Sequence, residues 1–128
     1  MIDLTTISTA DLKAELLKRS ERDHEMLVAE SLAWKIVNEL CGSAVMTAQV
    51  MDGNKGRAAV RFRWHAIAIC KGGNFQWSDA LVCRIFQRST STIHQACRAV
   101  AAECRTDFYT AERIRKVTER FSINPDFL

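Results

Sequence analysis

The scarcity of chain-breaking residues constrains this fold more than any other feature. The 128 residues include one proline and five glycines. An all-β sandwich or barrel needs many tight turns, and such turns depend on glycine and proline. Hydrophobic residues make up 48% of the chain and charged residues 26%, a balance typical of globular rather than disordered proteins. We therefore expect one all-α domain with a helical extension.

The N-terminal third predicts helix over residues 8–41. Ser8-Thr9-Ala10-Asp11 has the spacing of a capping box, and apolar residues recur at helical spacing over 33–41. Residues 18–25, KRSERDHE, contain no apolar side chain. The segment is therefore either one long helix with an exposed middle or two helices with a break there. Gly42 is the expected stop.

The middle of the chain contains the clearest loop and one ambiguous segment. Ser43 predicts the N-cap of a short helix that runs through Met51, and residues 52–56, DGNKG, predict a loop. In residues 57–71, apolar and basic side chains alternate as in a strand, yet a helical stripe fits the same residues. Periodicity alone leaves helix and strand open, and Gly72-Gly73-Asn74 ends the segment.

Two short helices with a tight connection are predicted next. Ser78 and Ser89 are good N-caps for helices at 78–86 and 89–102. Two short helices joined by about three residues are typical of a helix-turn-helix. A last helix is expected from about Asp107 or Thr110, with Ala111, Ile114, Val117 and Phe121 facing inward, and Asn124-Pro125 as its stop.

Charge is distributed unevenly along the chain. Residues 1–51 have a balance of −3, and residues 52–128 have a balance of +6. Between Lys55 and Arg98 there are eight basic residues and one acid, Asp79. Such a segment indicates a polyanionic partner, with a solvated basic face as the alternative. We therefore divide the chain into an N-terminal helical segment, 1–41, and a DNA-binding domain, 42–128.

Residues 57–121 resemble the C-terminal DNA-binding domain of the bacterial replication initiator DnaA. That domain shows an Arg-rich helix, a serine-started helix ending in Phe, and then a motif of the form RDHSTVxHAxxKI. The corresponding segments here are VRFRWHAI at 60–67, the helix at 78–86, and RSTSTIHQACR at 88–98. The resemblance implies a helix at 57–71 and duplex DNA reading in the major groove by the helix at 89–102. It also implies a role in replication or transcription control, in a stand-alone protein of the kind that phages or mobile elements encode.

The resemblance also implies the contact residues. The loop residues Lys55 and Arg57 would reach the minor groove, Arg63 would contact phosphate, and the start of the second helix would face bases or phosphates. The expected DNA-binding set is Lys55, Arg57, Arg61, Arg63, Arg88, Ser89, Thr90, Ser91, Thr92, Gln95 and Arg98. Ser89-Thr90 replaces the family's Asp-His pair, Gln95 replaces its second histidine, and the turn at Gln87 is one residue shorter. The family's own target sequence is therefore not assumed.

Other classes of function find less support in the sequence. No P-loop is present, and no histidine and cysteine pair lies beside a plausible oxyanion site, so we expect no enzyme activity and no cofactor. The five cysteines are scattered without a C-x-x-C pair, which predicts reduced thiols and no metal site. No apolar run is long enough for a bilayer, and no secretory signal is recognisable, so we expect a cytoplasmic, nucleoid-associated protein.

A different role is open for the N-terminal helix. It could mediate a homodimer or docking on another protein through Leu12, Leu16, Leu17, Met26, Leu27 and Trp34, which would make the chain an adaptor or an architectural nucleic-acid-binding protein. The alternative is that this helix folds back on the C-terminal helices, and the sequence leaves both open. The acidic balance of this segment makes protein contact more plausible than DNA contact. The three tryptophans, Trp34, Trp64 and Trp77, are expected to be core anchors, with stacking on single-stranded bases as the alternative.

Overall fold

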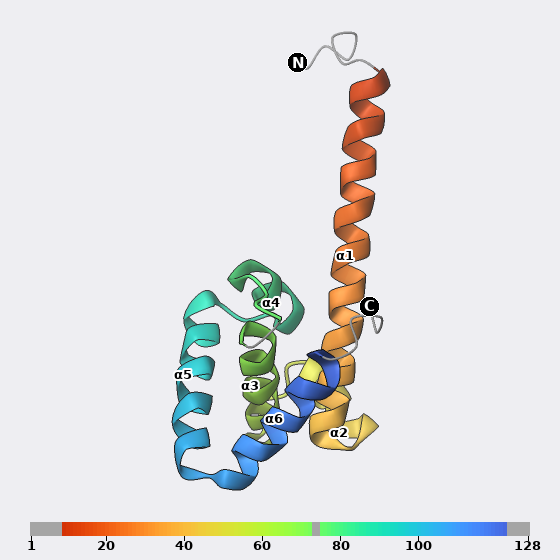
Figure 1. Cartoon of the computed structure of the whole chain (residues 1–128). Coiled ribbons are helices and arrows are strands. Elements are labelled where there is room, and N and C mark those ends of the chain that lie inside the picture. Colours follow the sequence, from red (N-terminus) through yellow and green to blue (C-terminus); the bar gives the residue numbers. More distant parts are fainter. Residues whose placement is uncertain (1–8, 73–74, 123–128) are drawn as a thin grey trace.

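The structure, a computed structural model, describes residues 9–72 and 75–122 and contains six helices and no strand within them (Figure 1). The helices are α1 (Thr9–Cys41), α2 (Ala44–Met51), α3 (Arg57–Lys71), α4 (Asp79–Phe86), α5 (Thr90–Thr106) and α6 (Phe108–Ser122). The expected all-α fold is confirmed, and the ambiguous segment at 57–71 is a helix. The predicted signals at Ser8, at Gly73-Asn74 and at Asn124-Pro125 lie outside the described residues.

Helix α1 is one helix of 33 residues, with no break at residues 18–25. Its first half extends away from the other helices, and its second half packs into them (Figure 1). Residues 18–25 are all polar or charged, so this stretch of helix needs no apolar partner. The helix stops at Gly42, whose φ of 65° places it in the left-handed region, and whose N–H donates to the Asn38 carbonyl at 2.8 Å.

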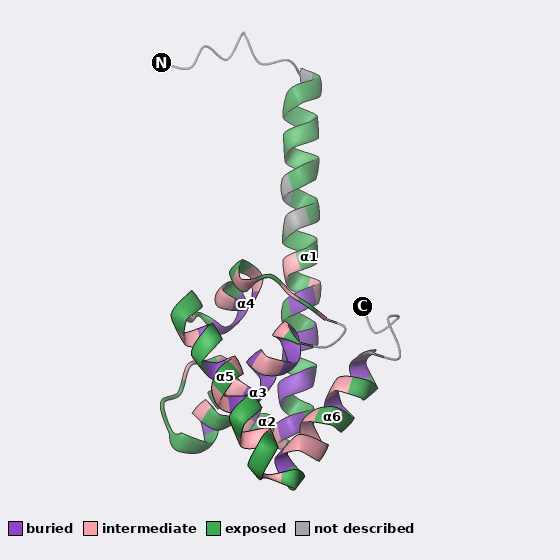
Figure 2. Ribbon diagram, turned by 60° about the vertical axis from the view of Figure 1, so that its left-hand side comes forward, coloured by how far each residue is buried: buried purple, intermediate pink, exposed green. Residues whose placement is uncertain are grey.

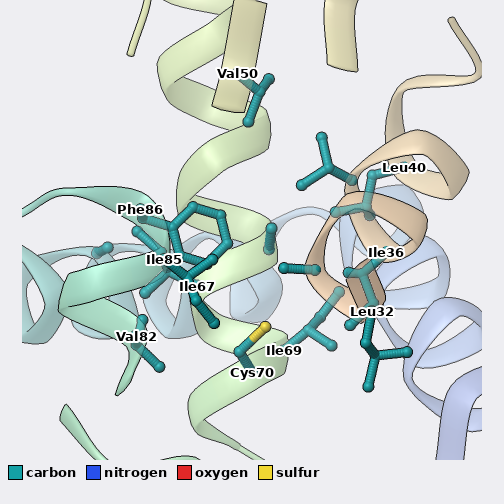
Figure 3. Close-up of a cluster of buried hydrophobic side chains, with 14 of the residues drawn as sticks. Leu32, Ile36, Leu40, Val50, Ile67, Ile69, Cys70, Val82, Ile85 and Phe86 are labelled. Carbon is teal, nitrogen blue, oxygen red and sulfur yellow. The ribbon is translucent and has the colours of Figure 1, made fainter. Parts of the chain in front are cut away.

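Helix α3 lies at the centre of the molecule and packs against each of the other five helices. Figure 3 shows Ile67 and Cys70 of this helix among side chains from three others. Leu32, Ile36 and Leu40 come from α1, Val50 comes from α2, and Val82, Ile85 and Phe86 come from α4. One hydrophobic core therefore joins elements from residue 29 to residue 121.

This core contains residues from both sides of the expected boundary at residue 41. Ile36 and Val37 of α1 have no exposed surface and belong to the same core as α3 and α4. Only the first half of α1 lies outside it, and Figure 2 shows that part of the helix exposed. Trp34 is also not a core anchor, because 38% of its surface is exposed. The buried stripe of α1 runs instead through Leu32, Ala33, Ile36, Val37 and Leu40.

The C-terminal helix closes the fold. Asp107 caps α6 through a hydrogen bond of 3.2 Å from the Thr110 N–H to Oδ1. Val117 and Phe121 are buried, as the sequence predicts, and Ile114 packs against the core. Across residues 9–72 and 75–122, no helix has both the length and the apolar character needed to cross a membrane.

Candidate nucleic-acid interface

Helices α4 and α5 form a pair of capped helices with a very short connection. The Ser78 hydroxyl accepts from the Leu81 N–H at 3.2 Å, and the Ser89 hydroxyl accepts from the Thr92 N–H at 3.3 Å. Between the helices, Gln87 has a φ of 53° and its N–H donates to the Cys83 carbonyl. This left-handed residue redirects the chain at once, so residues 87–89 are enough to join the two helices.

The orientation of α5 agrees with the sequence pattern. Ile93, Ala96 and Val100 are buried, and Ser91, Gln95 and Arg98 are exposed. Residues four and three positions apart share one face of a helix, so these three polar side chains form one outward row. The row offers a hydroxyl, an amide and a guanidinium, which are the groups that hydrogen-bond to phosphates and base edges.

The other hydroxyls at the start of α5 have partners inside the protein. The Thr92 hydroxyl lies 3.1 Å from the Ser89 hydroxyl, and the Thr90 hydroxyl lies 3.7 Å from the Cys83 sulfur. Ser89 and Thr92 therefore support the cap. Ser89, Thr90 and Ser91 are all exposed, and Ser91 lies one helical turn before Gln95 on the outward row.

The fold brings the 52–56 loop beside the turn between α4 and α5, although they are more than thirty residues apart in sequence. The Arg88 Nη2 atom lies 3.5 Å from the Gly53 carbonyl oxygen, and Arg88 Nη1 donates to the Gln87 carbonyl at 2.9 Å. Lys55 and Arg57, at the end of this loop, are exposed. The two predicted contact regions are thus neighbours, and Arg88 joins them.

The prediction for Arg63 is wrong. Its side chain is 2% exposed, and its guanidinium donates to the Val50 carbonyl at 2.9 Å and to the Asn54 carbonyl at 2.8 Å. Burial, with the nearby charge of Arg88, lowers the pKa of Arg63. The side chain therefore positions the 52–56 loop from inside the fold and does not reach a phosphate.

Arg61 also lies apart from the proposed contact row. Its Nη2 atom lies 2.6 Å from Glu103 Oε1 and 3.2 Å from the Thr110 hydroxyl. Glu103 is in the C-terminal part of α5, thirteen residues after Thr90. This length of helix spans about 20 Å. Arg61 is half exposed, but it joins α3 to α5 and α6 through this acidic partner.

A buried histidine completes the polar cluster around Glu103. His65 has no exposed surface; its Nε2 lies 3.1 Å from Glu103 Oε2, and Arg113 Nη2 donates to its Nδ1 at 3.3 Å. Because Nδ1 faces a donor, a neutral ring with its proton on Nε2 satisfies both partners. Burial lowers the pKa of His65, opposed by Glu103 and reinforced by Arg113 and Arg61.

A second cluster, which the sequence analysis did not identify, lies where α3, α4 and α5 meet. Asp79 Oδ1 lies 2.7 Å from Lys71 Nζ, and Asp79 Oδ2 lies 2.9 Å from His94 Nε2. Hydrogen bonds from Lys71 and His94 lower the pKa of Asp79. The single acid of the basic segment is therefore paired with a lysine and a histidine of neighbouring helices. Lys71, Asp79 and His94 are far apart in the sequence and form no short motif, so their spacing could not predict the cluster.

Comparisons with protein-family models, with curated proteins and with solved structures find no match to this chain. All five cysteines are free thiols, and Cys70 is completely buried. In the part of the chain that the structure describes, no group of three or more His, Cys, Asp or Glu side chains is placed to hold a metal ion.

Proposed function

We propose that this protein binds double-stranded DNA and reads its sequence in the major groove with α5. The binding face consists of Lys55, Arg57, Arg88, Ser91, Gln95 and Arg98. In this proposal the exposed row on α5 contacts base edges, and the loop residues contact the backbone beside the groove. The resemblance to the DnaA domain favours a role in replication or transcription control.

The observation that carries the proposal is the contact between Arg88 and the Gly53 carbonyl. Through it, the basic loop lies beside the N-terminal end of the outward row of α5. A recognition helix needs basic groups near its N-terminus that hold the phosphates on either side of the groove. The positive end of the α5 dipole at Thr90 adds to the same attraction.

The side chains of the outward row of α5 are chemically suited to base reading. Gln95 can form two hydrogen bonds with the N6 and N7 edge of adenine, and Arg98 can do so with the O6 and N7 edge of guanine. Both side chains are exposed, so neither needs to leave the core to reach a groove. Ser91 lies one helical turn before Gln95, and it can contact either a base or a phosphate.

The decisive experiment is selection of bound sequences from a random duplex pool, followed by titration of the enriched site at several salt concentrations. Each neutralised phosphate should contribute about 0.9 to the slope of log affinity against log salt. Lys55→Ala and Arg57→Ala should weaken binding to every sequence and reduce that slope by about one each.

A matched control is Lys116→Ala, because Lys116 is exposed on α6, outside the proposed face. This variant removes the same charge as Lys55→Ala and should bind DNA like the unaltered protein. Affinity that does not change with salt, or that falls equally for Lys116→Ala and Lys55→Ala, would contradict the proposed face. Absence of any enriched sequence would contradict base reading.

A further inference from the structure

A groove of about 560 Å³ lies between the C-terminal part of α3 and the middle of α5, which pack side by side (Figure 1). We call it the α3–α5 groove. Its apolar wall consists of small side chains, namely Ala68 of α3 and Cys97, Val100 and Ala101 of α5. Because these side chains are short, they leave a space that longer ones would fill. The volume falls within the range of sites for small organic molecules, about 300–1,000 Å³.

The polar side chains of the groove are Lys71, His94 and Arg98, and none of the described residues that line it is an acid. Asp79, just beyond the lining, is paired with Lys71 at 2.7 Å and with His94 at 2.9 Å. Arg98 is exposed and has no ion-pair partner among the side chains that the structure describes. The groove therefore combines an apolar wall with a guanidinium that can still accept a counter-ion.

We propose that the α3–α5 groove binds a small organic anion with an apolar body, such as an aromatic or fatty carboxylate. Its apolar body lies against Ala68, Val100 and Ala101, and its carboxylate pairs with Arg98. A guanidinium can donate two parallel hydrogen bonds to a carboxylate, which fixes the orientation of the ligand. An inorganic anion gains nothing from the apolar wall, and a neutral molecule gains nothing from the guanidinium. The two features together therefore select this class of ligand.

Arg98 belongs to two adjacent faces of α5. Four residues of this helix that line the groove follow three- and four-residue spacing and so share one face: His94, Cys97, Arg98 and Ala101. Arg98 also ends the outward row that begins at Ser91. A guanidinium paired with a carboxylate in the groove is not available to DNA, and the bound anion repels phosphates. Ligand and DNA therefore weaken each other's binding reciprocally. This consequence rests on the proposed function, whereas the groove itself does not.

The site is tested without DNA, by following the backbone amide NMR signals of the full chain during titration with benzoate, naphthoate and octanoate. At least one of these anions should bind saturably with a Kd below about 1 mM, and the largest changes should occur at residues that line the groove. The corresponding uncharged alcohol, and acetate, which lacks the apolar body, should each bind at least tenfold more weakly. Saturable binding by none of the three anions, changes centred elsewhere, or equal binding of the alcohol would overturn the proposal.

Two neighbouring alanines of α5 provide a matched pair of variants. Ala101 lines the groove and Ala102 does not, and both are exposed, so a larger side chain at either position does not enter the core. Ala101→Phe should fill the groove and weaken binding of the tightest anion at least tenfold, and Ala102→Phe should leave it unchanged. Arg98→Gln should reduce the affinity to that of the uncharged alcohol. An unchanged thermal transition confirms folding of each variant, and equal affinities of the two phenylalanine variants would overturn the position of the site.

The competition is tested by titrating duplex DNA with and without the tightest anion, at one fixed sodium concentration with chloride as the replacement. The anion should weaken DNA binding by the unaltered protein at least fivefold and leave DNA binding by Ala101→Phe unchanged. Unchanged DNA affinity of the unaltered protein, or an equal loss for Ala101→Phe, would overturn the competition. Absence of DNA binding in both conditions would contradict the proposed function, and the competition with it, but not the site, which the first titration measures alone.

Discussion

The buried guanidinium of Arg63 donates a hydrogen bond of 2.8 Å to the main-chain carbonyl of Asn54. A second bond from the same side chain, to the Val50 carbonyl, fixes the other end of the segment between α2 and α3. Arg63, which was expected from the sequence to contact phosphate, thus supports the loop that carries Lys55 from inside the fold. We therefore expect Arg63 to determine the position of the loop and Arg57 to contribute to DNA affinity.

The first prediction separates these two arginines. Arg63→Ala should lower the free energy of unfolding by about 3 kcal/mol, because it removes charged hydrogen bonds and leaves a buried carbonyl unsatisfied. Arg57→Ala, on the exposed first turn of the same helix, should change it by less than about 0.5 kcal/mol. Urea unfolding of both variants measures the difference. Equal stability of the two variants would contradict the internal role of Arg63.

The second prediction concerns base reading by Gln95. Gln95→Ala should keep the melting temperature nearly unchanged, because the side chain is exposed. It should cost about 1–3 kcal/mol at the selected site and relax the preference at one base position. Titrations against the selected duplex and against single-base variants of it provide the measurement. An equal loss on all sequences would mean that Gln95 contacts only the DNA backbone.

The third prediction concerns the stability of the fold between pH 7.5 and pH 5. The folded state holds His65 neutral, and its pKa is below the ordinary value of 6.5. The unfolded chain binds a proton at this histidine below about pH 6.5, so the stability due to the neutral ring is complete above that pH and is lost progressively as pH falls below it.

Unfolding free energies measured across this range should therefore decline towards acid in the unaltered protein. His65→Gln should show a shallower decline, because the amide does not titrate. His24→Gln, at an exposed position of α1, should keep the original pH dependence. A slope that is the same for His65→Gln and for the unaltered protein would exclude His65 as the titrating group.

The fourth prediction concerns the turn between α4 and α5. Gln87 adopts a φ of 53°, which costs a residue with a side chain about 1 kcal/mol and costs glycine almost nothing. Gln87→Gly should therefore raise the free energy of unfolding by up to about 1 kcal/mol. Gln87→Ala keeps the strained conformation and should give no such gain. Thermal unfolding compares the two, and a gain for alanine equal to that for glycine would argue against backbone strain as the cause.

Local chemistry determined most of the helix boundaries in advance. Ser43, Ser78 and Ser89 are each observed as N-caps, with their hydroxyls accepting from the third N–H that follows. Gly42 ends α1 in the left-handed conformation that the sequence suggests. The burial of Ile93 and the exposure of Gln95 likewise follow from spacing. These features depend on a few adjacent residues, so the sequence by itself determines them.

Tertiary packing decided what local pattern left open or misassigned. Because five helices surround α3, its buried residues do not form one stripe, and the segment resembles both helix and strand in the sequence. Arg61 and Arg63 are two residues apart on this helix, and they point in different directions. One meets Glu103 at the surface, and the other enters the space below the 52–56 loop. Their partners are 42 residues away in one case and 13 in the other, and only the folded chain brings them within hydrogen-bonding distance.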